Sequence, residues 1–461
     1  MTSPPSDKAA REGTPPRRAA EHGAAPTREA AAAGKPASLW HNRDFRLWWG
    51  GTMLSTVGDE VTAVALPLIV LLLTGSPLHA GLVGSVESIP PLLLSLPLGM
   101  LVDRVSRRAV MVTASLLSAA SIATVPLAYL TDSLSLSQLY VVAFVSSLAA
   151  TAYRIADTAA LPGITGPHKL GEAASQSETI YGTSALIAAP LAGLMFETMS
   201  PAAPFLLDAL SFVAIATAIL AIRSRLGPNG APGPLRWRSQ LTAGMRITAR
   251  LPLVRTLTLL TAVGDFLFSG IGLLLIVLAK ESGASGFEVG TVFTAAGVGS
   301  LLGAALAPRI EVGLGLRTAV VGKHWLTALL FPLLLLDLPG WGIGLVWGLV
   351  ALQVAVLNVI QMKYLMSQVH SDQLGRVQGF MTFLSKTGLP LGYALTGFLL
   401  DRWGSWGTVL IFEAVLLCLA VYALLGRGLR ESHVTRSAPA GSGLPGDQEH
   451  RGRRERRASN R

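Results

Sequence analysis

The sequence predicts an all-α membrane protein with twelve transmembrane helices in two six-helix bundles. The first observation is the composition: of 461 residues, 51% are apolar and only 14% are charged, and the mean hydropathy is +0.52. Soluble domains carry about 25% charged residues, so a water-soluble globule is excluded. The second observation is a series of long apolar stretches separated by short charged connectors. The third is that the two parts of the chain repeat one plan.

Each apolar stretch is long enough to cross a bilayer, since a hydrocarbon core of about 30 Å needs roughly 20 helical residues. The alternating pattern of a membrane β-barrel is absent, which leaves helices as the spanning structure. Internal prolines at positions 67, 90, 91, 190 and 390 predict kinks. The expected spans are residues 47–73, 78–101, 109–130, 138–160, 172–196, 204–222, 253–279, 287–308, 317–336, 340–361, 376–400 and 405–426.

The positive charges predict the orientation of these spans. With the N-terminus inside, Lys and Arg residues gather in the two tails and the inner connectors, and the outer connectors hold only Lys280 and Arg402. This is the asymmetry of the positive-inside rule. We therefore expect a multi-pass protein of the cell membrane with both termini in the cytoplasm. Residues 1–40 and 429–461 lack apolar periodicity and are predicted to be disordered cytoplasmic tails.

A long inner connector, residues 223–252, separates an N-terminal bundle at 41–222 from a C-terminal bundle at 253–428. It is rich in glycine and proline, and its basic run at 236–238 predicts an interfacial amphipathic segment. Three pairs of segments match across it at nearly one offset, which indicates a parallel repeat. The matches are Gly58-Asp59 with Gly264-Asp265, Gly193 and Glu197 with Gly397 and Asp401, and Asp208-Ala209 with Glu413-Ala414.

Several motifs resemble those of the major facilitator superfamily, which is built as a 6+6 repeat. The most specific is the loop after the second span, with Gly99, Leu101, Asp103, Arg104, Arg107 and Arg108. Ala189, Pro190 and Gly193 are similar to the antiporter signature, with alanine in place of a glycine. Other segments resemble the branch of macrolide and siderophore exporters, and the resemblance covers about residues 40–428. These segments are 42–49 (NRDFRLWW), 58–59 (GD), 65–67 (ALP), 74–77 (TGSP), 205–212 (FLLDALSF) and 375–377 (GRV).

The resemblance implies a conformational latch on the inner side, which joins the bundles when the cavity opens outward. Asp103 is expected to face the start of the eleventh span near Gly375, because a carboxylate is favourable at the positive end of a helix dipole. The alternative is that these charges only set the topology. The residues assigned to the latch are Gly99, Asp103, Arg104, Arg107, Arg108, Asp157, Gly375 and Arg376.

Ionisable residues inside the spans are costly and therefore predict a functional site. Asp59 and Asp265 lie roughly 18 to 20 Å deep at ~1.5 Å per residue, and we expect both to flank a central cavity. Apolar surroundings favour the neutral carboxyl group and a bound cation favours the charged one, which would link protonation to cargo binding. The alternative is that each aspartate bonds to a neighbouring helix and never titrates. The further candidates are Glu60, Glu87, Glu178 and Lys386, while Asp208 and Glu413 are expected near water at the outer side.

The predicted function is that of a secondary transporter and not of an enzyme. The single cysteine, Cys418, excludes an intrachain disulfide and cysteine-based metal ligation, and no P-loop or zinc-protease motif is present. The glycines at 297, 299 and 303 predict close helix packing. No cofactor, metal or nucleic acid is expected.

We expect proton-coupled efflux of an amphipathic drug, antibiotic or siderophore by a monomer in the lipid bilayer. One alternative is a proton-coupled uptake permease. The other, from a different class, is a non-transporting scaffold or receptor with the same fold.

Overall fold

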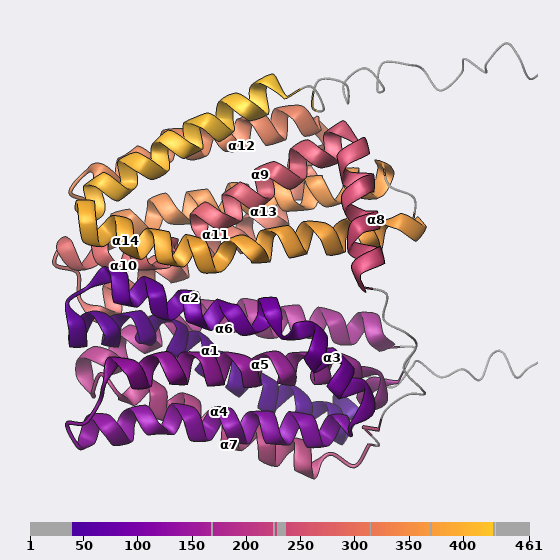
Figure 1. Ribbon diagram of the computed structural model, residues 1–461, viewed down its shortest axis with the longest axis vertical. Helices are drawn as coiled ribbons and strands as arrows, with labels where there is room; N and C mark the ends of the chain where they lie inside the picture. Colours follow the sequence, from indigo (N-terminus) through magenta and orange to yellow (C-terminus); the bar gives the residue numbers. More distant parts are fainter. Residues whose placement is uncertain are drawn as a thin grey trace, which may run out of the picture.

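The computed structural model describes residues 39–166, 169–224, 226–227, 237–313, 315–368, 371–426 and 429, and these residues form helices and no strand (Figure 1). In chain order the elements are η2 (Leu39–His41), α1 (Arg43–Thr74), α2 (Pro77–Leu93), α3 (Ser95–Arg104), α4 (Arg107–Leu130), α5 (Leu136–Thr165), α6 (Leu170–Thr198), α7 (Ala203–Ala221), α8 (Trp237–Arg250), α9 (Pro252–Phe268), α10 (Ile271–Glu281), α11 (Gly286–Gly313), α12 (Leu316–Leu330), η4 (Phe331–Leu335), α13 (Gly340–Gln368) and α14 (Ser371–Leu425).

The twelve predicted spans are confirmed by these helices. Ten helical segments are long and apolar enough to cross a membrane, and α2 with α3, bent by 50°, make an eleventh. The segment counted as α14 contains Gly404 at φ 67° and ψ −173°, a left-handed backbone conformation that L side chains rarely adopt. The chain reverses at this glycine, so α14 comprises two spans and the described residues hold twelve.

The spans form two bundles that lie side by side in Figure 1, α1 to α7 in the N-half and α9 to α14 in the C-half. We call the end where α1 begins and α14 ends the terminal end, and the opposite end the far end. Between the halves, α6 packs mainly on α11, and α2 packs on α14. The ribbons of the halves meet at the far end and spread apart toward the terminal end.

Small residues bring the halves together at the far end. A Cβ at Gly193 of α6 would collide with the carbonyl of Gly286 in α11. On the other side of the interface, a Cβ at Gly81 of α2 would lie 2.8 Å from the Cα of Gly397 in α14. Backbones can approach this closely only where no side chain intervenes.

Glycines also bring helices together inside the C-half. A Cβ at Gly299 would collide with the carbonyl of Gly348, and one at Gly303 with the carbonyl of Leu352. The close helix packing that the sequence predicts for this glycine run is therefore confirmed.

Two prolines explain the break between α2 and α3. Proline has no N–H to donate, so Pro91 leaves the carbonyl of Glu87 without its helical partner. The hydroxyl of Ser147, from α5, donates to that carbonyl at 2.5 Å. The remaining predicted kink sites, Pro67, Pro190 and Pro390, lie inside α1, α6 and α14.

Candidate functional site

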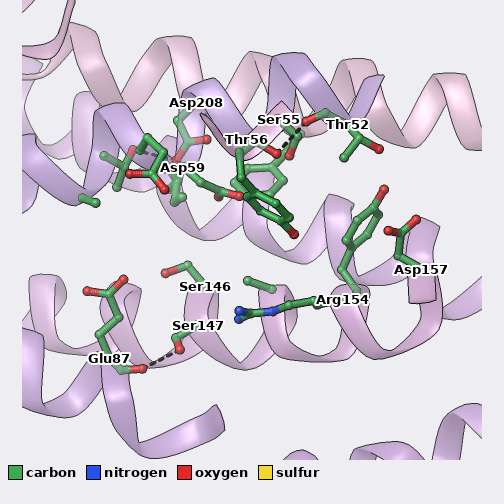
Figure 2. A pocket seen from close by; sticks show the side chains of 18 residues that line it. Thr52, Ser55, Thr56, Asp59, Glu87, Ser146, Ser147, Arg154, Asp157 and Asp208 are labelled. Carbon is green, nitrogen blue, oxygen red and sulfur yellow. Dashed lines mark hydrogen bonds between the residues drawn. The ribbon is translucent and has the colours of Figure 1, made fainter. Parts of the chain in front are cut away.

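A polar cavity of about 290 Å³ lies inside the N-half (Figure 2). Residues from α1, α2, α5, α6 and α7 line it. Polar residues at helical spacing supply one wall, namely Thr52, Ser55, Thr56 and Asp59 of α1. Asp59 is the seventeenth of the 32 residues in this helix, and its side chain is exposed to the cavity. The carboxylate therefore stands near the middle of the span, as the sequence predicts.

Gly58, next to Asp59 in α1, has no side chain, and the carboxylate of Asp208 from α7 occupies the space beside it. A Cβ at Gly58 would lie 2.5 Å from both Asp208 Oδ1 and Ser211 Oγ. Asp208 is fully buried and accepts hydrogen bonds from Thr62 Oγ1 at 2.6 Å and from Ser211 Oγ at 3.3 Å. Asp208 borders the N-half cavity, but its side chain is buried and its oxygens are satisfied by Thr62 of α1 and Ser211 of its own helix. The expected position near water at the outer side is therefore not observed.

A second cavity, of about 490 Å³, lies between the two halves. It continues from the first, because Glu60, Glu87 and Arg154 line both. The C-half supplies Lys386 of α14 to this cavity. Apolar and aromatic side chains complete that wall, among them Leu273, Ile276, Phe293, Leu389 and Tyr393. Three of the predicted residues, Glu60, Glu87 and Lys386, are thus brought to one chamber, and all three are exposed to it.

Arg154 is the cation of α5 in this chamber. Figure 2 shows its guanidinium directed toward Ser146 and Ser147 and away from Asp157. The Asp157 carboxylate instead accepts a hydrogen bond of 2.6 Å from Trp48 Nε1 of α1. The sequence assigned Asp157 to the latch, whereas the structure turns it into the N-half cavity, because α5 presents this position to α1.

Asp59 lines the N-half cavity and not the chamber between the halves. Asp265 lines neither of these two spaces, so the structure does not bring the two aspartates to one central cavity. Asp265 lines a separate cavity of about 80 Å³ within the C-half, between α9, α12 and α13. Lys323, His324, Asn358 and Gln361 line this cavity as well. The ring of His324 is buried and its Nδ1 bonds to the carbonyl of Val320 at 2.7 Å. The C-half therefore contains its own cluster of polar side chains around a small cavity.

The repeat relation between the halves does not extend to the polar contacts behind Asp59 and Asp265. Gly264, the counterpart of Gly58, has open space where a Cβ would stand. Glu413, the counterpart of Asp208, buries its Oε2 without a hydrogen-bond partner among the described residues. The remaining candidate, Glu178, is exposed on α6, three residues before Tyr181, which lines the N-half cavity.

The latch contact expected between Asp103 and the start of α14 is not formed among the described residues in this conformation. Asp103 and Arg104 are exposed at the end of α3, and Arg376 is exposed near the start of α14. Open space surrounds the positions where a Cβ would stand at Gly99 and Gly375. Within the part of the chain that the structure describes, no hydrogen bond or ion pair joins the Asp103 carboxylate to α14.

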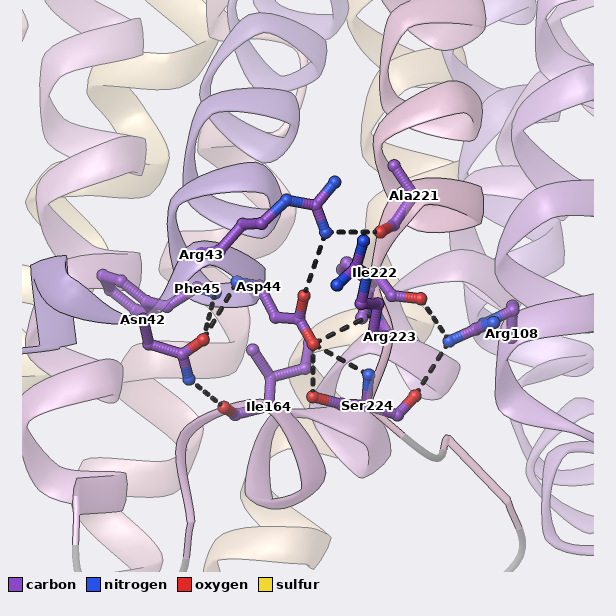
Figure 3. A network of polar contacts seen from close by, with 10 residues as sticks. All are labelled: Asn42, Arg43, Asp44, Phe45, Arg108, Ile164, Ala221, Ile222, Arg223 and Ser224. Atoms are coloured by element: carbon purple, nitrogen blue, oxygen red, sulfur yellow. Dashed lines mark hydrogen bonds and ion pairs between the residues drawn. The ribbon is translucent and has the colours of Figure 1, made fainter.

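Arg107 and Arg108 belong to contacts within the N-half. The backbone N–H of Arg107 donates to the carbonyl of Leu226 at 3.1 Å. Figure 3 shows Arg108 Nη2 donating to the carbonyls of Ile222, at 2.6 Å, and Ser224, at 2.8 Å. These carbonyls follow the last turn of α7, where helical partners end. The side chain of Arg108, assigned to the latch from the sequence, therefore caps α7 here.

Asp44 of α1 completes this network at the terminal end (Figure 3). Its Oδ2 accepts from the N–H groups of Arg223 and Ser224 at 3.1 and 2.8 Å, and from Ser224 Oγ at 2.6 Å. The start of α1 and the end of α7 are thereby held together.

Three residues that line the cavities, Ser147, Tyr153 and Tyr393, are not predicted from the sequence. The signal available for α5 was a polar stripe at helical spacing, formed by Ser146, Ser147, Arg154 and Asp157. A tyrosine in an apolar span gives no comparable signal, because its ring is equally typical of a helix contact.

Comparisons with known proteins agree with this architecture. The family model described as transmembrane secretion effector matches residues 35–440. The multidrug efflux pump Tap of Mycolicibacterium fortuitum is 30% identical over 395 residues, which cover 81% of this chain and 93% of that protein. Macrolide efflux protein A of Streptococcus pyogenes is 21% identical over 389 residues, covering 81% and 93%.

Two solved structures show the same fold. The nucleoside transporter NupG superposes with a TM-score of 0.64 at 14% identity, covering 83% of this chain and 98% of that chain. A bacterial homologue of the iron transporter ferroportin, in its inward-facing state, superposes with a TM-score of 0.66 at 16% identity, covering 84% and 98%.

Proposed function

Because this chain belongs to the transmembrane secretion effector family of major facilitator transporters, we propose that it exports amphipathic small molecules such as drugs or antibiotics by proton-coupled alternating access. The observation that carries the proposal is the chamber between the halves, which combines a few charged side chains, Glu60, Glu87, Arg154 and Lys386, with a largely apolar lining. Export is supported by the relatives, since Tap is named a multidrug efflux pump and the streptococcal protein a macrolide efflux protein.

The chamber suits cationic or neutral lipophilic cargo. Glu60 and Glu87 from the N-half offer negative charge to a cation, and Phe293 and Leu389 from the C-half offer apolar surface. A pocket that buries most of a ligand against apolar side chains and orients it with a few polar groups is typical of small-molecule sites. A volume of about 490 Å³ is large enough for a drug-sized molecule.

The conformation supports alternating access with the terminal end on the cytoplasmic side. The halves are in contact at the far end, through Gly193 with Gly286 and Gly81 with Gly397. At the terminal end no bond joins the Asp103 carboxylate to α14 among the described residues. Lys and Arg residues gather at the terminal end, which supports its cytoplasmic orientation. In this state cargo would enter the chamber from the cytoplasm, and closing the latch would accompany opening of the far end.

Proton coupling is proposed for Asp59, Glu60 and Glu87. Their side chains are exposed to connected cavities inside the membrane region, so both water and cargo reach them. A carboxylate in such a place binds either a proton or a cation, and the two ligands therefore compete. Asp265 and Lys323 in the C-half cavity form a second polar group that protons could reach.

The test is the accumulation of a panel of cationic and neutral lipophilic compounds by cells with and without the gene. We expect lower accumulation with the gene, and loss of the difference after a protonophore. Glu87→Gln should restore accumulation at unchanged abundance in the membrane. The matched control is Glu172→Gln, an exposed carboxylate in the first turn of α6. Unchanged accumulation across the panel would contradict export, and proton-driven uptake would establish a permease.

A further inference from the structure

Two carboxylates at the far end reach across the interface between the halves. Glu197, near the end of α6 in the N-half, accepts hydrogen bonds from the N–H groups of Gly286, at 2.8 Å, and Phe287, at 3.4 Å, in the C-half. Asp401, of α14 in the C-half, accepts a hydrogen bond of 2.7 Å from the hydroxyl of Ser76 in the N-half. Each half thus extends one acidic side chain to the other.

The two contacts are related by the internal repeat. Glu197 follows Gly193 by four residues, and Asp401 follows Gly397 by four residues. Gly193 packs on Gly286, at the start of α11, and Gly397 packs on the carbonyl of Pro77, at the start of α2. In both places a glycine lets two helices touch, and one turn further on a carboxylate meets the beginning of the opposite helix.

At the start of α11, Glu197 accepts a hydrogen bond from a backbone N–H that has no helical partner in the C-half. The first amides of a helix have no helical partners. Ser285 and Glu288 form a reciprocal cap, in which the N–H of Ser285 donates to Glu288 Oε2 at 2.8 Å and the N–H of Glu288 donates to Ser285 Oγ at 3.3 Å. The N–H of Gly286 is left for Glu197. The negative charge also lies at the positive end of the helix dipole.

We propose that Glu197 and Asp401 are two clasps that hold the far end closed, and that their release is required for the far end to open. The proposal rests on the alternating access proposed above. Separation of α6 from α11 exchanges charged hydrogen bonds at a helix terminus for contacts with water. The Asp401 clasp is the weaker of the two, because it holds one hydroxyl group and no helix amide.

The experiment measures distances between spin labels across the far end in the full-length protein, reconstituted in lipid. The labels are attached at Leu130→Cys in the N-half and Trp341→Cys in the C-half, in a Cys418→Ser background. Leu130 and Trp341 are 78% and 69% exposed and lie at far-end termini of α4 and α13. A short distance reports the closed far end, and a long distance reports the open one.

We expect E197Q to raise the ratio of open to closed populations by roughly fivefold, and D401N by roughly twofold, from the usual strength of a charge at a helix terminus and of a surface hydrogen bond. Because opening breaks both clasps, the effects should multiply in the double variant, to about tenfold. The matched control is E288Q, which changes a carboxylate at the same helix start whose hydrogen bond stays within the C-half. Its ratio should equal that of the wild type.

Equal ratios in E197Q and wild type would overturn the clasp, provided that an open population is present. A ratio raised as much by E288Q as by E197Q would also overturn it, by showing that any loss at the start of α11 has this effect. A single short distance in every variant, including Gly193→Ala, would overturn alternating access together with the clasp. Since the labels report conformation without transport, a wrong cargo assignment leaves these outcomes unchanged.

Discussion

Ser147 Oγ donates a hydrogen bond of 2.5 Å to the backbone carbonyl of Glu87, and this contact fixes one carboxylate of the chamber. The carbonyl is free to accept because Pro91 has no N–H. Inside a membrane such a carbonyl must find a partner in the protein, and α5 supplies it. The proline pair therefore bends α2, and the serine holds the bend where Glu87 faces the cavity.

Replacing Ser147 by alanine should release this bend. Ser147→Ala leaves a carbonyl without a partner, which costs about 1 to 3 kcal/mol of stability. We expect a lower thermal unfolding temperature in detergent and a lower export rate, because Glu87 loses its fixed position. The control is Ser146→Ala, whose hydroxyl bonds to Val142 of its own helix at 2.7 Å. Equal effects of the two variants would contradict this role.

Gly58→Ala should separate α1 from α7. The added methyl group would lie 2.5 Å from Asp208 Oδ1 and from Ser211 Oγ, and both are buried. Overpacking of this kind costs about 1 to 3 kcal/mol, and we expect a corresponding fall in thermal stability. Gly50→Ala, on the same helix with open space around it, should be neutral or stabilising. A stable Gly58→Ala protein would show that α7 can move away without loss.

Gly193→Ala should prevent closure of the far end. The new Cβ would collide with the carbonyl of Gly286, and a backbone atom cannot turn away as a flexible side chain would. The expected result is a protein that inserts into the membrane, populates the far-end-open state and no longer transports. Gly182→Ala on the same helix meets its first neighbour, a Leu301 methyl, only at 4.0 Å and should transport normally. Spin-label distances across the far end and export assays on both variants test this prediction. A Gly193→Ala protein that closes the far end and transports normally would contradict it.

Asp103 and Arg108 belong to one motif, but we expect Arg108 to affect stability and Asp103 to affect the populations of the two conformations. Arg108→Gln removes hydrogen bonds to the carbonyls of Ile222 and Ser224 and should cost about 1 to 3 kcal/mol of stability, with little change in the populations of the two conformations.

Asp103→Asn changes an exposed side chain and should leave the unfolding temperature unchanged. By weakening the latch, it should lower the far-end-open population by roughly twofold to fivefold. A destabilised Asp103→Asn protein with unchanged populations would refute the latch.

Residue pattern alone predicted the spans closely, because a bilayer imposes one requirement on every crossing segment. The predicted span 204–222 corresponds to Ala203–Ala221, and the predicted pair 376–400 and 405–426 is divided at Gly404. Asp59, Glu60, Glu87 and Lys386 were likewise predictable as cavity residues, since a charge in an apolar span needs water or a partner.

The sequence did not predict which residues of different helices contact each other. Asp59 and Asp265 occupy matching positions in the repeat, yet Asp59 lines a cavity inside the N-half that adjoins the shared chamber, and Asp265 lines a separate cavity inside the C-half. Arg108 belongs to a recognisable motif, yet its partners lie 114 and 116 residues away in the chain. Such partners depend on how far each helix is rotated and shifted against its neighbours.

Hydropathy and charge thus determined that this chain crosses the membrane twelve times in two related halves, because the cost of burying charge in lipid acts on each segment separately. Tertiary structure decided which acidic groups share water, which bond to backbone and which reach across to the other half. Those outcomes depend on contacts of a few ångströms between segments far apart in the chain, such as Glu197 with Gly286. Local composition carries no information about distances of that kind.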